Sequence, residues 1–160
     1  MLTQTTETAI KALLFIAIEK EKQPLSIAVI AKKLKCSPTY LSKTMGHLAK
    51  AGIIAVQHGS KGGMSIQRPY DQITLLEVVQ ACQGMFLPDF CDTPEDHSIH
   101  ICTFHKAMHE VREATLKTLG KWRLANLVAN PQGNIVGKTH PVCKMRFGDS
   151  KVVAKAVGVS

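Results

Sequence analysis

Apolar residues recur at every third or fourth position over the first fifty residues, which is the spacing of helices that bury one face. A first helix is predicted over residues 4–20, and Thr5 or Thr6 can cap its start. Its apolar face is formed by Ile10, Leu13, Leu14 and Ala17. The sequence KEKQP ends this helix. A second helix is predicted over residues 25–35, with Ser26 as its N-cap.

A third helix is predicted over residues 37–52. Ser37 is a good N-cap, and Pro38 follows at the first helical position, where a missing N–H costs nothing. Gly52 ends the helix in the way that a left-handed C-terminal residue does. The inner stripe of this helix consists of Leu41, Met45 and Leu48.

Two short strands are predicted next, over residues 53–57 and 64–67, and HGSKGG between them has the glycines and the positive charge of an exposed turn. Two short helices joined by a turn and followed by a β-hairpin with a basic tip are typical of a winged helix-turn-helix. In that arrangement the third helix enters the major groove, and the hairpin, called the wing, contacts the DNA backbone or the minor groove. The predicted fold class is therefore mainly α with a small β-wing.

A further helix is predicted over residues 73–84, where Thr74 can act as the N-cap and Glu77 stands three positions later. A long helical pattern then runs from Phe104 to about Val128. One apolar stripe follows it: Phe104, Met108, Val111, Thr115, Leu119 and Trp122. A helix of about 25 residues cannot bury such a stripe within one small domain, so we expect a homodimer. A core role within a single chain is the alternative.

We expect the chain to form one domain with an extension. Residues 1–80 are the predicted winged helix-turn-helix, 81–103 the end of the connecting helix and a Cys/His loop, 104–129 the dimerisation helix and 130–160 a tail. The tail has turn residues and no clear period, so we expect it to be partly disordered or to hold a short strand.

The net charge of +8 is unevenly distributed over the 160 residues. Residues 1–70 carry ten Lys or Arg against three Asp or Glu, and residues 105–160 carry the same numbers. Residues 71–104 carry six acidic residues and no Lys or Arg. The basic N-terminal block suits a polyanion such as DNA, although basic surfaces often serve only solubility.

No run of about 18 apolar residues is present, so we expect no membrane span. The N-terminus lacks the basic start and the cleavage site of a signal peptide. A cytoplasmic protein is expected, and its five cysteines then favour metal binding, redox chemistry or burial over a disulfide framework. Since no nucleophile elbow, phosphate loop or paired acid–base motif is found, an enzyme is not expected.

The predicted helices, wing and long C-terminal helix, in the order in which they follow along the chain, resemble the Rrf-type transcription regulators of bacteria, the group that includes IscR and NsrR. The resemblance rests on SIAVIAKKLKCSPTYLSKTMGHLAKAGII, the wing HGSKGGMSIQRP and ITLLEVVQACQG, and it extends over about residues 1–128. It implies a homodimer that binds a pseudo-palindromic DNA operator, with a long C-terminal helix that crosses to the partner subunit.

Family members hold an iron–sulfur cluster through three cysteines in the loop before the long helix. In the stretch CDTPEDHSIHICTFH, the resemblance assigns Cys91 and Cys102 to the first and last of these cysteines. The middle cysteine is absent, and His97 or His100 stands near its place.

The resemblance also implies a fourth ligand. His105 fits the histidine that IscR-like members have three residues after the last cysteine, and Glu7 fits the acidic residue that NsrR-like members supply from the first helix of the other subunit.

Two thiolates with histidine or carboxylate partners favour a 2Fe–2S cluster over a 4Fe–4S cluster, because replacing cysteine by histidine is known chemistry for the smaller cluster. Zinc is the alternative, since two cysteines and two histidines are an ordinary tetrahedral set, and haem iron stays open. A solvated loop without any metal is the remaining interpretation.

Exposed early positions of the third helix are predicted to face base edges or phosphates: Ser37, Thr39, Tyr40, Ser42 and Lys43. In the wing, Lys61 is the predicted contact to a phosphate or the minor groove, and Gly62 allows close approach. His58 stands before the wing glycines, where the family often has an arginine.

The sequence therefore predicts a dimeric DNA-binding transcription regulator that senses redox state, nitric oxide or iron–sulfur status through a metal cofactor. The alternative is a regulator of the same fold that contains zinc or no cofactor and responds to thiol oxidation or a small ligand.

Overall fold

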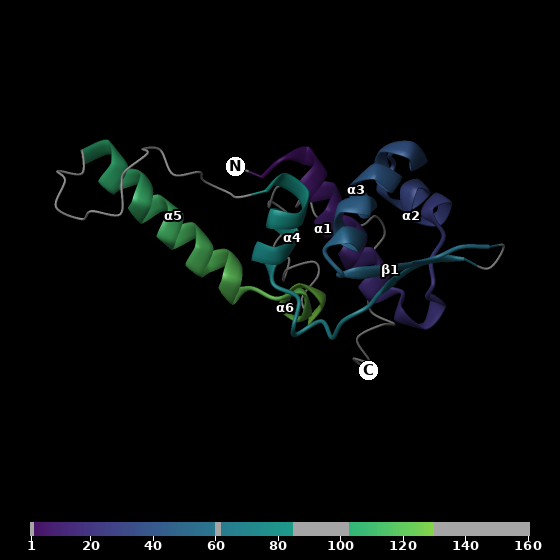
Figure 1. The fold of residues 1–160 in the computed structure, drawn as a ribbon. Coiled ribbons are helices and arrows are strands. Elements are labelled where there is room, and N and C mark those ends of the chain that lie inside the picture. The colour runs from purple at the N-terminus through teal and green to yellow at the C-terminus, as the bar shows by residue number, and fades with distance from the viewer. Residues whose placement is uncertain (1, 60–61, 85–102, 130–160) are drawn as a thin grey trace, which may run out of the picture.

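The computed structural model of the protein describes residues 2–59, 62–84 and 103–129. Its elements in chain order are α1 (Gln4–Ile18), the 3-10 turn η1 (Lys20–Lys22), α2 (Ile27–Leu34), α3 (Pro38–Lys50), β1 (Ile54–Gln57), β2 (Gly63–Ile66), α4 (Leu75–Gln83), α5 (Thr103–Lys121) and α6 (Leu124–Ala129). The predicted mainly helical architecture with a two-stranded wing is confirmed. Figure 1 shows a body from which α5 extends on one side and the hairpin on the other.

Helix α1 lies at the centre of the body and contacts α2, α3, α4, α6 and β2. Because it is surrounded on most sides, nearly every residue from Ala9 to Ala17 is buried. Its N-cap is Thr3, whose hydroxyl accepts a hydrogen bond from the Thr6 N–H at 3.2 Å. The prediction of Thr5 or Thr6 as the cap is therefore wrong by two or three residues. Thr6 is buried instead, and its hydroxyl donates to Gln83 at 2.8 Å.

The helix-turn-helix consists of α2 and α3, and local chemistry sets its boundaries. Ser26 and Ser37 cap the two helices, as predicted, and each hydroxyl accepts a hydrogen bond from the N–H three residues later. Between the helices Lys35 adopts the left-handed conformation with φ of 55°. Gly52, with φ of 66°, ends the α3 segment as predicted.

The wing is an antiparallel hairpin in which Ile54 pairs with Ile66 and Gln57 with Gly63. It is attached to the body by reciprocal hydrogen bonds between the backbones of Leu25 and Met64, of 2.8 and 3.0 Å. A Cβ on Gly63 would lie 2.7 Å from the Leu25 carbonyl, so the close approach of these two backbones requires a glycine.

The long helix predicted from Phe104 to about Val128 is interrupted, and this expectation is corrected. Helix α5 ends at Lys121, and α6 begins at Leu124. Between them the backbone pairs with the start of α4: the Leu75 N–H donates to the Trp122 carbonyl, and the Leu124 N–H donates to the Ile73 carbonyl, both at 2.8 Å. Leaving the helix at this point places Leu124 in the core, where 2% of its surface is exposed.

None of the helices in the described ranges has the length and apolar character needed to cross a membrane.

Candidate nucleic-acid interface

Helix α3 has one buried face and one exposed face. Leu41, Thr44, Met45 and Leu48 are buried against the body. The exposed face has hydroxyl and basic side chains: Thr39, Ser42, Lys43, His47 and Lys50. Sequence reasoning missed the last two of these residues. His47 and Lys50 follow Lys43 by four and seven positions, which places them on the same face of a helix, and this spacing could have identified them.

Two of the predicted contact residues also have roles within the fold. Ser37 is exposed, and its hydroxyl oxygen accepts the Tyr40 N–H at 3.1 Å, which leaves the hydroxyl proton available to a phosphate. Tyr40 is half-buried, and its hydroxyl lies 3.5 Å from Thr5 Oγ1 on α1, at the long end of the hydrogen-bond range. The hydroxyl of Tyr40 therefore reaches α1 from the first turn of α3.

The tip of the wing contains the remaining predicted DNA contacts. His58 is exposed, directly before Gly59, which has φ of 109°. The Gly62 N–H donates to the Gly59 carbonyl at 2.9 Å, and a Cβ on Gly62 would overlap the Gln57 carbonyl oxygen. Gly62 is thus required by the tight turn itself. Lys61 lies outside the described residues.

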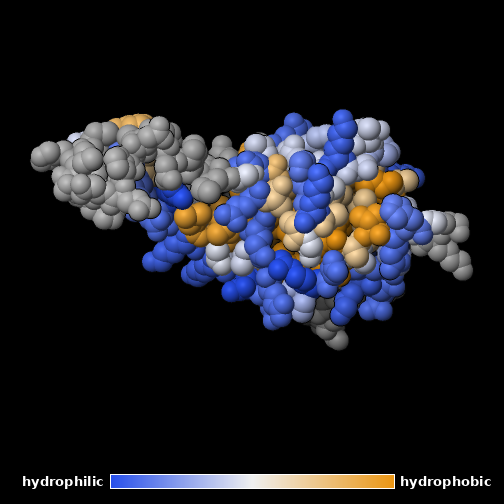
Figure 2. All heavy atoms as spheres, in the orientation of Figure 1, coloured by the Kyte–Doolittle hydropathy of each residue, from blue (hydrophilic) through white to orange (hydrophobic). Residues whose placement is uncertain are grey.

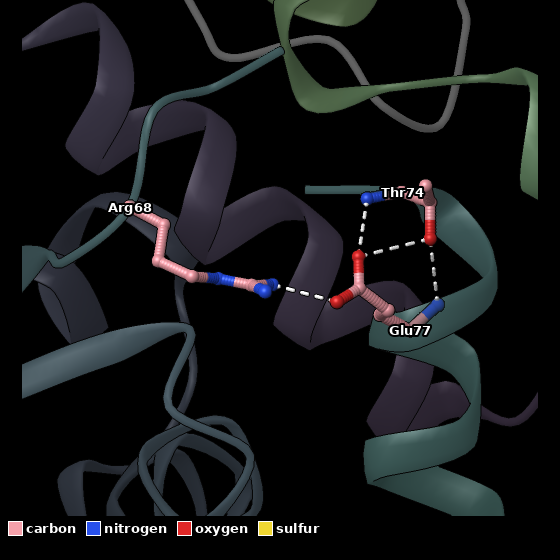
Figure 3. Close-up of polar contacts among 3 residues, drawn as sticks. All are labelled: Arg68, Thr74 and Glu77. Atoms are coloured by element: carbon pink, nitrogen blue, oxygen red, sulfur yellow. Dashed lines mark hydrogen bonds and ion pairs between the residues drawn. The ribbon is translucent and has the colours of Figure 1, made fainter. Parts of the chain in front are cut away.

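An ion pair connects the end of the wing to the start of α4 (Figure 3). Arg68 Nη2 lies 2.7 Å from Glu77 Oε1. The second carboxylate oxygen of Glu77 accepts the Thr74 N–H at 2.8 Å and the Thr74 hydroxyl at 3.0 Å. The Thr74 hydroxyl in turn accepts the Glu77 N–H, which completes the predicted capping box.

The environment of Glu77 favours its charged form. Burial alone would raise the pKa of its carboxyl. The hydrogen bonds from the Thr74 N–H, the Arg68 guanidinium and the Thr74 hydroxyl, together with the charge of Arg68, outweigh burial and hold the pKa below its ordinary value. At neutral pH this carboxylate is therefore ionised and holds both groups.

The same short segment also holds the end of α5. Residues 73–75 form the backbone pairing with residues 122–124, and Thr74 and Arg123 make an isolated antiparallel bridge. The exit of the wing, the first turn of α4 and the last turn of α5 thus meet at one place, which we call the wing–α5 joint: Arg68, Ile73, Thr74, Leu75, Glu77 and residues 122–124. The wing, through Arg68, and α5, through residues 122–124, therefore both contact the segment 73–77.

The predicted cofactor ligands are only partly within the described residues. Cys91, His97, His100 and Cys102 lie outside them. Glu7 is half-buried in the first turn of α1, and His105 is half-buried in the first turn of α5. Within the described ranges no three His, Cys, Asp or Glu side chains gather into a potential metal site.

The end of α4 is joined to the start of α1 beside Glu7. Gln83 Oε1 accepts hydrogen bonds from the Thr3 N–H at 3.1 Å and from the Thr6 hydroxyl at 2.8 Å. Helix α4 therefore ends at the same end of the body as the first turn of α1. The donor set of two thiols, imidazoles and a carboxylate suits iron–sulfur or zinc chemistry.

The two cysteines in the described residues are free thiols that pack against the core. Burial raises the pKa of the Cys36 thiol, and it raises the pKa of the Cys82 thiol to about 11. Both are therefore protonated at neutral pH and are poor nucleophiles. For these two cysteines the structure supports burial, which is one of the three roles that the sequence left open.

The apolar stripe of α5 stays largely open in the single chain, and no residue of this helix is buried. Phe104 is 60% exposed, Val111 47% and Trp122 46%. Figure 1 shows the C-terminal end of this helix nearest to α4, and a Cβ on Gly120 would lie 3.8 Å from the Leu76 side chain. In Figure 2, apolar surface is visible where α5 approaches the body.

Comparison with known proteins agrees with this architecture. A family model, Rrf2, described as an iron-dependent transcriptional regulator, matches residues 2–130. The structure of CymR, the global cysteine regulator of B. subtilis, is similar with a TM-score of 0.67 and 20% identity, covering 80% of this chain and 95% of that chain.

IscR of T. potens is similar with a TM-score of 0.68 and 17% identity, covering 86% of this chain and 93% of that chain. Staphylococcus aureus CymR has a TM-score of 0.63 and 21% identity, over 79% of this chain and 96% of that chain. At these identities the likeness shows the fold, and it confirms the predicted winged helix.

Proposed function

Because the chain belongs to the Rrf2 family of transcriptional regulators, we propose that it is a cytoplasmic homodimer that binds a pseudo-palindromic DNA operator and alters its affinity with the state of a metal cofactor. The observation that carries this proposal is the exposed face of α3, with its hydroxyl and basic side chains, beside a wing fixed to the same body. In this proposal residues 1–80 bind DNA, 81–103 form the cofactor loop and the open apolar stripe of α5 forms the dimer contact, while α6 packs within the chain.

Different side chains of α3 contact the phosphates and the bases of the DNA. Ser37 and Lys43 contact phosphates, since one lies at the helix start and the other has a long charged side chain. Thr39 and Ser42 are short and exposed, so they suit hydrogen bonds to base edges in the major groove. Tyr40, which packs toward Thr5, positions the start of α3.

The wing supplies the second set of contacts. Lys61, which follows the exposed His58 by three positions in the sequence, binds the DNA backbone or the minor groove. Gly62 keeps the turn narrow, because any side chain there would overlap the Gln57 carbonyl.

The cofactor site of this proposal consists of Cys91, Cys102 and either His105 or His97, with Glu7 of a second copy completing it. Two thiolates and an imidazole suit a 2Fe–2S cluster better than a 4Fe–4S cluster. Such a cluster supplies a centre that oxidants, nitric oxide or iron shortage can alter. Zinc is the alternative metal for the same residues.

The wing–α5 joint gives this proposal a physical route from the loop to the DNA. The loop enters α5 at Thr103, and α5 ends in backbone hydrogen bonds to residues 73–75. Arg68 and Glu77 connect that segment to the wing. When the residues that bind the cofactor hold the first turn of α5, the orientation of this helix is fixed. The distance between the two wings of the dimer is then fixed as well.

The cofactor is tested by anaerobic purification, a visible spectrum, and counts of iron and acid-labile sulfide per chain. We expect a coloured protein with about two of each per chain, as a 2Fe–2S cluster requires. Cys91→Ala and Cys102→Ala are each expected to abolish the colour, whereas the control Cys82→Ala retains it because the Cys82 thiol is buried and protonated. A colourless wild type with one zinc per chain would support the zinc alternative.

A second candidate function is a regulator of the same fold without any cofactor. It is favoured by the loss of the middle cysteine and by the similarity in fold to CymR, a global cysteine regulator, which makes a small thiol-containing metabolite a reasonable ligand. A wild-type protein that contains neither iron nor zinc, and whose DNA affinity changes with such a metabolite, would support this candidate.

A further inference from the structure

Helix α3 contains a glycine that nothing in its own fold explains. Gly46 lies well inside Pro38–Lys50, and glycine is the poorest helix former after proline. Its φ is not positive, so the backbone conformation does not require glycine. A Cβ built on it meets no atom within 4 Å, so packing does not require glycine either. This distinguishes it from Gly62 and Gly63, where a Cβ would overlap backbone atoms.

The position of Gly46 on the helix indicates what the missing side chain leaves open. Successive residues of a helix are rotated by about 100°, so residues three and four apart share a face. Gly46 therefore lies between Ser42 and Lys50, beside Lys43. These neighbours are exposed, whereas the buried residues Leu41, Thr44, Met45 and Leu48 lie on the other side. Gly46 is itself half-buried, and it lies among these exposed residues on the side of the helix away from the buried ones.

We propose that Gly46 is the close-approach position of the recognition helix, where bare backbone lets α3 sit deeper in the DNA major groove. This inference rests on the proposed DNA-binding function. The major groove is about 12 Å wide, and a helix with its side chains is roughly 10–12 Å across. Side chains in the middle of the face that enters the groove therefore limit how deeply the helix can lie in it. The absence of a side chain there brings the short hydroxyl of Ser42 within reach of base edges.

The reach of the neighbouring residues supports this assignment. Thr39 and Ser42 have short side chains and must approach a base closely to form a hydrogen bond. Lys43, His47 and Lys50 surround the glycine with longer basic side chains that reach the phosphates at the rims of the groove. Gly46 is therefore a specificity-determining position, because depth affects the base contacts more than the phosphate contacts.

Two substitutions test the proposal. The operator used in these measurements is first selected by the wild-type protein from a pool of random DNA duplexes. Gly46→Ala is expected to raise the Tm by about 3 °C, because alanine favours the helix and nothing obstructs it. It is expected to weaken binding of that operator by about tenfold, with little change on unrelated duplex. Gly46→Leu is expected to weaken operator binding further. The matched control is Gln80→Ala, because Gln80 is an exposed, uncharged residue within α4 to which no role in binding is assigned.

The control variant should retain full operator affinity. Equal operator affinity for wild type, Gly46→Ala and Gly46→Leu, all folded, would overturn the inference while leaving the proposed function intact. A lower Tm for Gly46→Ala would also overturn it, because the glycine would then serve the fold itself. A wild-type protein that selects no duplex at all would overturn the proposed function, and this inference with it.

Discussion

Replacing Val111 by glutamate is expected to convert the dimer into a monomer and to weaken operator binding by about a hundredfold or more. Val111 lies within the open stripe of α5 and is 47% exposed in the single chain. In a dimer the introduced carboxylate would be buried in an apolar contact without a partner, which strongly disfavours association. The two winged helices would then bind their half-sites separately and lose the advantage of being linked.

The matched control is His109→Glu, which introduces the same side chain on α5 at an exposed position turned away from the stripe. Molar mass in solution by light scattering separates the outcomes, because the chain has a mass of 17.5 kDa. The control is expected to have twice this mass, and Val111→Glu the mass of one chain. If Val111→Glu remained a dimer with full operator affinity, the stripe would not be the dimer contact.

Replacing Glu77 by alanine is expected to lower the free energy of unfolding by about 2 kcal/mol. The change removes the capping box of α4 and leaves the Arg68 guanidinium without its carboxylate. Arg68 Nε is already buried with no hydrogen-bond partner within the described ranges, so its charge loses its main compensation. Operator affinity is expected to fall roughly fivefold, because the wing is held less firmly against α4.

The pH dependence of this effect follows from the lowered pKa of Glu77. The pKa of this carboxyl has an ordinary value of 4.5 in the unfolded chain and is lower in the folded protein. The ionised carboxylate therefore stabilises the fold at pH values above 4.5. This contribution is lost as the pH falls through the pKa of the folded state. The stability difference between wild type and Glu77→Gln is therefore expected in full at pH 7. It should shrink below about pH 4.

Chemical denaturation at pH 7 and pH 3 measures both effects. Glu21→Ala serves as the control, because Glu21 is exposed and its loss should change stability by less than about 0.5 kcal/mol. Wild-type stability in Glu77→Ala, or a difference for Glu77→Gln that persists undiminished at pH 3, would show that the ion pair does not hold the joint.

Local side-chain chemistry made much of the fold predictable. The caps Ser26, Ser37 and Thr74 depend on side chains that bond to a backbone only a few residues away, and all three are confirmed. The resemblance to the Rrf-type regulators is likewise confirmed by the family match. Thr3 was missed because three threonines compete for the start of α1, and the choice depends on the contact of Thr6 with Gln83, 77 residues away.

The features that escaped prediction depend on contacts between distant segments. The helical spacing of apolar residues continues through Trp122 in the sequence. In the structure, backbone pairing of residues 122–124 with residues 73–75 ends α5 before this point. The partial burial of Tyr40 requires α1 beside α3, which the pattern of α3 alone does not contain. Arg68 and Glu77 lie on different elements, so no periodicity connects them. The DNA contacts and the cofactor ligands stay predictions, and Cys91, His97 and Cys102 lie outside the described residues.

The most direct test of the regulatory proposal compares the operator affinity of one protein preparation before and after removal of its cofactor, at constant salt concentration. Salt must be constant because phosphate contacts make DNA affinity depend strongly on it. The proposal predicts at least a tenfold change in operator affinity, an unchanged affinity for unrelated duplex, and recovery after the cofactor is restored. Equal operator affinity in both states would contradict a cofactor-sensing regulator.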